Sequence, residues 1–93
     1  MKIQAEISLY PLRQNELTKP IRQFTELLEN NKLKVKLGPM STLVTGDSLV
    51  VFENLQKAFE KLAEEYEVVM TAKISNACPE VNEDKTGFLK NRK

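Results

Sequence analysis

The fold is decided at residues 33–45, LKVKLGPMSTLVT, near the middle of the 93-residue chain. Leu33, Val35 and Leu37 alternate with two lysines, a period of two that is typical of a half-buried β-strand. Gly38-Pro39 then gives a strong turn signal. Residues 40–45 follow as a returning strand. The stretch therefore predicts a β-hairpin.

A helical pattern lies on each side of this hairpin. Apolar residues recur at intervals of three and four positions, which places them along one stripe of a helix. Before the hairpin the stripe contains Leu17, Ile21, Phe24, Leu27 and Leu28, and after it Val51, Phe52, Leu55, Ala58, Phe59 and Leu62. We therefore expect one amphipathic helix before the hairpin and one after it.

An alternating segment occupies each outer position. Residues 2–10 place Ile3, Ala5, Ile7 and Leu9 on one side, and residues 68–75 repeat the alternation. The order strand, helix, strand, strand, helix, strand predicts the α+β class, as a ferredoxin-like βαββαβ sandwich with an antiparallel four-stranded sheet and two helices on one face. We expect one domain over residues 1–80 and a polar, flexible tail over residues 81–93.

Composition limits the chemistry of the chain. Fourteen basic and thirteen acidic residues leave a net charge of +1, so there is no broad cationic field for nucleic acid, and no segment predicts membrane insertion. The lone Cys78 and the absence of histidine argue against an internal disulfide and a four-ligand metal site. We therefore expect a cytoplasmic protein with no metal, no cofactor and no catalytic residues.

The strand residues that point away from both helices should form an uncovered sheet face. That face has two interpretations from alternation alone, a solvated or dimer-facing surface, or a surface that orients a small heterocycle through a few hydrogen bonds. Glu6 could bind the edge of an aminopyrimidine or form a cross-strand ion pair with Lys73. The expected residues of this face are Gln4, Glu6, Ser8, Tyr10, Val69, Thr71, Lys73 and Ser75.

Three segments together resemble the YkoF-like family of thiamin- and hydroxymethylpyrimidine-binding proteins. They are residues 5–12 (AEISLYPL), 38–47 (GPMSTLVTGD) and 73–79 (KISNACP), and the likeness runs from about Ile3 to Pro79. The resemblance implies a ferredoxin-like domain that pairs through its sheet with another copy, with ligand pockets near the sheet. Some relatives hold two such domains in one chain, so a single copy suggests a homodimer or a dimer of dimers.

The function that the resemblance implies is non-catalytic binding of thiamin or its hydroxymethylpyrimidine precursor, in support of uptake or salvage. The alternative is a regulatory or assembly domain that oligomerises through its sheet face without a vitamin ligand. An enzyme acting on a pyrimidine is a third and less favoured interpretation. The residues expected to bind the ligand supply hydroxyl, carboxylate and amide groups: Glu6, Ser8, Tyr10, Ser41, Thr42, Ser75 and Asn76.

Overall fold

The structure is a computed structural model that describes residues 1–29 and 32–77. The expected tail, residues 81–93, lies outside the described residues, as do Cys78 and Pro79. Neither helix in the described part of the chain is long and apolar enough to cross a membrane. The six elements are β1 (Lys2–Pro11), α1 (Thr18–Leu28), β2 (Lys34–Leu37), β3 (Thr42–Asp47), α2 (Ser48–Ala63) and β4 (Val68–Ser75).

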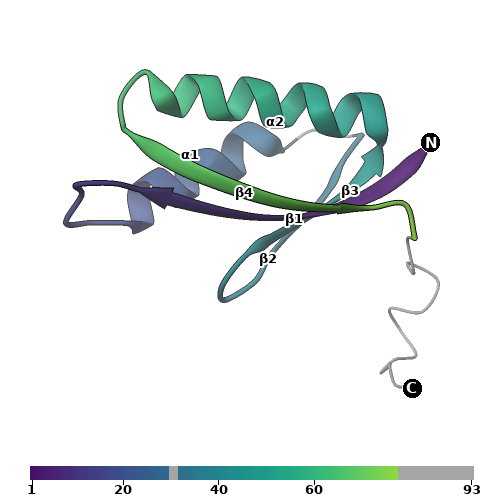
Figure 1. Ribbon diagram of the computed structural model, residues 1–93, viewed down its shortest axis with the longest axis horizontal. Coiled ribbons are helices and arrows are strands. Elements are labelled where there is room, and N and C mark those ends of the chain that lie inside the picture. The colour runs from purple at the N-terminus through teal and green to yellow at the C-terminus, as the bar shows by residue number, and fades with distance from the viewer. Residues whose placement is uncertain (30–31, 78–93) are drawn as a thin grey trace.

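The four strands form one antiparallel sheet in the order β2-β3-β1-β4. Both helices cover the same face of this sheet, which confirms the predicted ferredoxin-like arrangement (Figure 1). β1 is a central strand because its alternation gives it a fully apolar side to place under the helices. Along it the buried apolar residues are Ile3, Ala5, Ile7 and Leu9.

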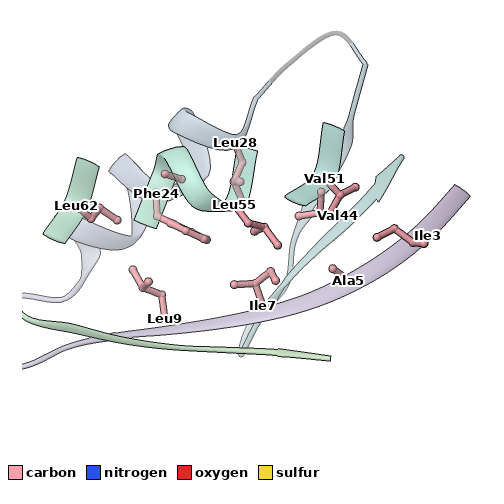
Figure 2. Close-up of a cluster of buried hydrophobic side chains, with 11 residues drawn as sticks. Ile3, Ala5, Ile7, Leu9, Phe24, Leu28, Val44, Val51, Leu55 and Leu62 are labelled. Atoms are coloured by element: carbon pink, nitrogen blue, oxygen red, sulfur yellow. The ribbon is translucent and has the colours of Figure 1, made fainter. Parts of the chain in front are cut away.

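The core lies between β1, β3 and the two helices. Figure 2 shows side chains from β1 pointing toward those from α1 and α2. Fully burying a Leu, Ile, Val or Phe side chain stabilises a fold by about 1.5–3 kcal/mol, so this cluster is the main source of stability. Its helical and β3 members are Phe24, Leu28, Val44, Val51, Leu55, Ala58 and Leu62.

The hairpin differs from its prediction at the turn. β3 begins at Thr42, two residues later than expected, and continues to Asp47. The amide of Gly38 donates a hydrogen bond to the carbonyl of Ser41 at 2.8 Å, which closes a tight turn. Pro39 and Met40 therefore lie in the turn, and the Met40 side chain is 86% exposed.

Some apolar residues assigned to the core by periodicity lie at the surface instead. Phe52 is 53% exposed and Phe59 is half-buried, although both belong to the predicted stripe of α2. On β4, Ala72 and Ile74 are exposed on the helix-covered side of the sheet. The reason is that β4 is an edge strand with few contacts to α2, so the helix leaves part of this side of the strand exposed.

Asp47 joins the end of β3 to the start of α2. Its side chain accepts a hydrogen bond from the amide of Leu49 and so caps the helix, and it contacts the ammonium group of Met1 at 3.0 Å. The Met1 ammonium, followed by the Leu49 amide, holds the pKa of the Asp47 carboxyl below its ordinary value. A carboxyl with a lowered folded pKa contributes stability above its unfolded pKa and loses that contribution as pH falls.

Two substitutions separate the cap from the charge at Asp47. Asp47→Ala should lower the melting temperature at pH 7 more than Asp47→Asn, because asparagine still accepts the Leu49 amide but has no charge for the Met1 ammonium. The gap between wild type and Asp47→Asn should shrink as pH falls below the unfolded pKa of an aspartate, about 4, toward the lowered pKa of the folded protein. Thermal unfolding at pH 7 and pH 3 measures both effects. Equal melting temperatures for the two variants at pH 7 would contradict the capping role.

Candidate functional site

A cavity lies beside the second half of β1, where β3 has not yet begun. The pairing of β1 with β3 ends at Ile7 and Thr42, whereas its pairing with β4 continues to Pro11 and Val68. From Ser8 onward β1 therefore has a strand neighbour on one side only. Because alternate residues of a strand direct their main-chain groups to each side, some amides and carbonyls of this segment face the gap.

The cavity has a volume of about 230 Å³, and we call it the strand-end cavity. Its walls come from β1, from the first turns of α1 and from the β2–β3 turn, and they are mostly apolar. Three apolar side chains at it, those of Leu17, Leu37 and Met40, are exposed, which is unusual for residues with no partner. The apolar lining residues are Ile7, Leu9, Pro11, Leu17, Ile21, Phe24, Leu37, Pro39 and Met40.

Thr42 is the buried polar residue of the strand-end cavity. It is 5% exposed, and its hydroxyl makes no hydrogen bond with any residue in the ranges 1–29 and 32–77. A buried hydroxyl without a partner costs roughly 1–3 kcal/mol. An apolar cavity with one buried, unsatisfied hydroxyl and nearby main-chain groups is suited to a small, flat ligand that carries a few hydrogen-bonding atoms.

The structure brings some of the predicted site residues together and separates others. Ser8, Tyr10, Ser41 and Thr42 line the strand-end cavity. Glu6 does not line it, but its Oε2 accepts a hydrogen bond from the Ser41 hydroxyl at 2.8 Å. Glu6 therefore lies beside the cavity, where it contacts Ser41 and forms no ion pair with the described Lys73.

Ser75 and Asn76 lie elsewhere. Ser75 pairs with Gln4, which is four residues, or about 13 Å, along β1 from Ser8. The Ser75 hydroxyl accepts a hydrogen bond from the amide of Ala77 at 2.9 Å, and both Ser75 and Asn76 are exposed. The expected convergence of strand-end amides and hydroxyls on one ligand is thus not seen for this pair.

The loop between β1 and α1 is fixed at the far end of the cavity. The amide of Leu12 donates to the carbonyl of Glu67 at 2.7 Å, and the Arg13 side chain forms an exposed ion pair with the same residue. Arg13 has a positive φ of 57°, a conformation that costs a non-glycine residue energy. These contacts tie the loop to the segment before β4, and Leu17 follows from it into the cavity wall.

Sequence reasoning missed the apolar walls of the cavity. Leu17, Ile21 and Phe24 were predicted as helix residues that face the core, and Met40 as a strand residue. An apolar residue directly after a Gly-Pro turn was the available signal, because turns favour polar residues. The position of the gap itself depends on where β3 begins to pair with β1, which is a tertiary property.

The fold and the cavity together define the class of protein. This is a ferredoxin-like α+β protein with an apolar cavity at the end of its sheet. Within the described residues there is no group of three or more His, Cys, Asp or Glu side chains that could hold a metal ion. The sequence profile of the YkoF-related family matches residues 2–81, and the chain belongs to that family.

Solved structures share the fold. The hypothetical protein MJ1052 of Methanocaldococcus jannaschii is 25% identical with a TM-score of 0.75, over 83% of this chain and 81% of that one. Protein SP2199 of Streptococcus pneumoniae is 21% identical with a TM-score of 0.79, over 94% and 99% of the two chains. A Thermotoga maritima protein described as a candidate for thiamine biosynthesis or salvage is 17% identical with a TM-score of 0.78, over 95% and 99%. No curated protein matches the chain.

Two substitutions of Thr42 test whether its hydroxyl is unsatisfied. Thr42→Val should leave the melting temperature unchanged or raise it, because valine has nearly the same shape and removes a buried polar group without a partner. Thr42→Ala should lower stability by about 1 kcal/mol, because it also removes a buried methyl group. Chemical denaturation measures both. A loss in Thr42→Val as large as that in Thr42→Ala would mean that the hydroxyl is satisfied in the folded protein.

Proposed function

We propose that this protein binds thiamin or its hydroxymethylpyrimidine precursor without converting it, with the pyrimidine ring in the strand-end cavity. The observation that carries the proposal is the buried, unsatisfied Thr42 hydroxyl in a mostly apolar cavity. Membership of the YkoF-related family and the fold shared with a candidate thiamine biosynthesis or salvage protein support it. Binding of this kind would serve uptake or salvage.

The size of the cavity suits one aromatic ring. Pockets for drug-sized molecules measure about 300–1,000 Å³, and the strand-end cavity has about 230 Å³. A hydroxymethylpyrimidine would fill it, and the second ring of thiamin would extend past the exposed Leu37 and Met40 at the turn. The exocyclic amine and ring nitrogens of the pyrimidine would pair with the Thr42 hydroxyl and the main chain of β1.

The side chains at the cavity favour binding over catalysis. The chain has no histidine, so the commonest general base near neutral pH is missing. The nearest carboxylate, Glu6, is exposed and accepts the Ser41 hydroxyl. A serine that donates to a carboxylate resembles a nucleophile with its base, but no other residue among those that the structure describes donates to Glu6 to orient the pair. Ser41 also lies in the β2–β3 turn, where its carbonyl accepts the Gly38 amide.

Calorimetric titration with hydroxymethylpyrimidine, thiamin and thiamin phosphate tests the proposal. Thr42→Val should weaken binding of the preferred ligand roughly 5-fold to 150-fold, the range expected when a buried hydrogen-bonding partner of 1–3 kcal/mol is lost. Ser75→Ala is the matched control, since it removes a hydroxyl from the far end of the sheet, and should bind as wild type. High-performance liquid chromatography of the ligand after incubation with the protein should show no product.

Two outcomes would contradict this function. If none of the three ligands binds wild-type protein at millimolar concentration, the assembly-domain alternative replaces vitamin binding. If Ser75→Ala weakens binding and Thr42→Val does not, the ligand lies on the open face of the sheet and not in the strand-end cavity.

We extend the proposal to a homodimer formed through the β4 edge. Lys61 of α2 lines a hollow between α2 and α1. Phe52 precedes it by nine positions, or two and a half turns, and therefore lies on the opposite side of the helix, on the flank that faces away from α1. We propose that the exposed Phe52, Ala72 and Ile74 and the half-buried Phe59 act as one apolar strip beside the open edge of β4, which we call the α2/β4 flank. A second copy paired antiparallel along β4 would bury both the strip and the unpaired main-chain groups of the edge.

Sedimentation of wild type and two variants tests the dimer. Ile74→Lys should shift the protein toward monomer, because a charge would have to be buried in the α2/β4 flank. Leu37→Lys places the same charge at an exposed apolar residue on the opposite edge of the sheet, and should sediment as wild type. A wild-type protein that is monomeric at micromolar concentration, or equal effects of the two substitutions, would contradict pairing through β4.

A further inference from the structure

A second hollow lies on the face of the sheet that the helices do not cover. Its volume is about 260 Å³, and we call it the open-face hollow. Thr45 and Thr42 are three residues apart in β3, so their side chains lie on opposite faces of the sheet. The open-face hollow and the strand-end cavity have no lining residue in common. Its lining residues are Gln4, Lys34, Val35, Lys36, Leu43 and Thr45.

Thr45 is the polar centre of the open-face hollow. It is only 8% exposed although it belongs to the uncovered face, because its neighbours close around it. Its hydroxyl makes no hydrogen bond to any other residue that the structure describes. A hydroxyl that is more than nine-tenths buried, lines a hollow and lacks a protein partner is a vacant hydrogen-bonding position.

Donors surround this hydroxyl. The strand registers place Lys34 opposite Thr45 on one side and Gln4 opposite it on the other, so that the three residues form a row across β2, β3 and β1. Lys36 lies two residues along β2 and so projects to the same face as Lys34. Ammonium groups donate and never accept, and the Gln4 amide and Thr45 hydroxyl can each donate as well.

Two carboxylates on the same face of β1 and β3, those of Glu6 and Asp47, have contacts with groups other than Lys36. Glu6 lies in the next row, separated from Lys36 by Leu43, and its Oε2 accepts the Ser41 hydroxyl. Asp47 follows on the same face of β3, but its carboxylate contacts the Met1 ammonium and the Leu49 amide. Among the residues that the structure describes, Lys36 therefore has no carboxylate partner.

We infer that the open-face hollow binds an oxyanion, a phosphoryl or carboxylate group of a small molecule, between the Lys36 ammonium, the Thr45 hydroxyl and the Gln4 amide. Charge-assisted hydrogen bonds to such a group are shorter and about twice as strong as neutral ones. The inference does not depend on the proposed vitamin ligand, because the two sites share no lining residue.

Calorimetry with inorganic pyrophosphate and with citrate, at constant ionic strength set by sodium chloride, tests the site and distinguishes the two kinds of oxyanion. Lys36→Gln should weaken binding of the preferred anion about tenfold or more, and Thr45→Val about fivefold or more. Lys57→Gln removes an exposed charge from α2, and Thr42→Val removes the buried hydroxyl of the opposite face. Both control variants should bind the anion as wild type.

Amide chemical shifts measured during the same titrations locate the anion. Changes that saturate at Gln4, Lys36 and Thr45 support the assignment. Absence of saturable binding for both anions would overturn it, as would equal losses in Lys36→Gln and Lys57→Gln, which indicate general screening of surface charge. Because Thr42→Val tests the strand-end cavity separately, failure of one site is distinguishable from failure of the other.

Discussion

The structure depends on one constraint, that β1 is longer than the strand it pairs with on one side. Eight residues of the ten-residue β1, from Gln4 to Pro11, pair with β4, but β3 accompanies β1 only to Ile7. The part of β1 that pairs with β3 carries the core, since Ile3, Ala5 and Ile7 point from it toward the helices. The remaining part leaves a gap that α1 and the β2–β3 turn close from the sides, and that gap is the strand-end cavity.

Periodicity in the sequence predicts the fold well because burial along β1 is decided within the strand. Alternation there places one side under the helices whatever the neighbours are. Periodicity fails for Phe52 and Ile74, which have the spacing of core residues but lie at the surface. Whether a residue with core spacing is buried depends on how far α2 extends over an edge strand, and no local pattern contains that information. Alternation predicts the hairpin as it predicts β1, but the residue at which β3 begins is determined by the hydrogen bond from the Gly38 amide to the Ser41 carbonyl.

The candidate site was less predictable than the fold, because its residues meet across the sheet. The expected residues Ser41 and Thr42 are adjacent in sequence, yet the pleat directs Thr42 toward the helices and Ser41 toward Glu6 on the open face. Hydroxyl-bearing residues can be found by inspection of a sequence, whereas their convergence depends on register. The two buried threonines of β3 show this most clearly, since both lack a partner among the described residues and each faces a different hollow.

The two edges of the sheet differ in a way that limits how copies of the chain can associate. β2 is four residues long and carries Lys34 and Lys36, so that a second strand approaching it would meet like charges and few pairing positions. β4 is twice that length and has one charged residue, Lys73. Two copies joined through β4 would present only their β2 edges outward. Edge pairing would then stop at two subunits, so the same asymmetry that permits a closed pair protects the protein from linear polymerisation into fibres.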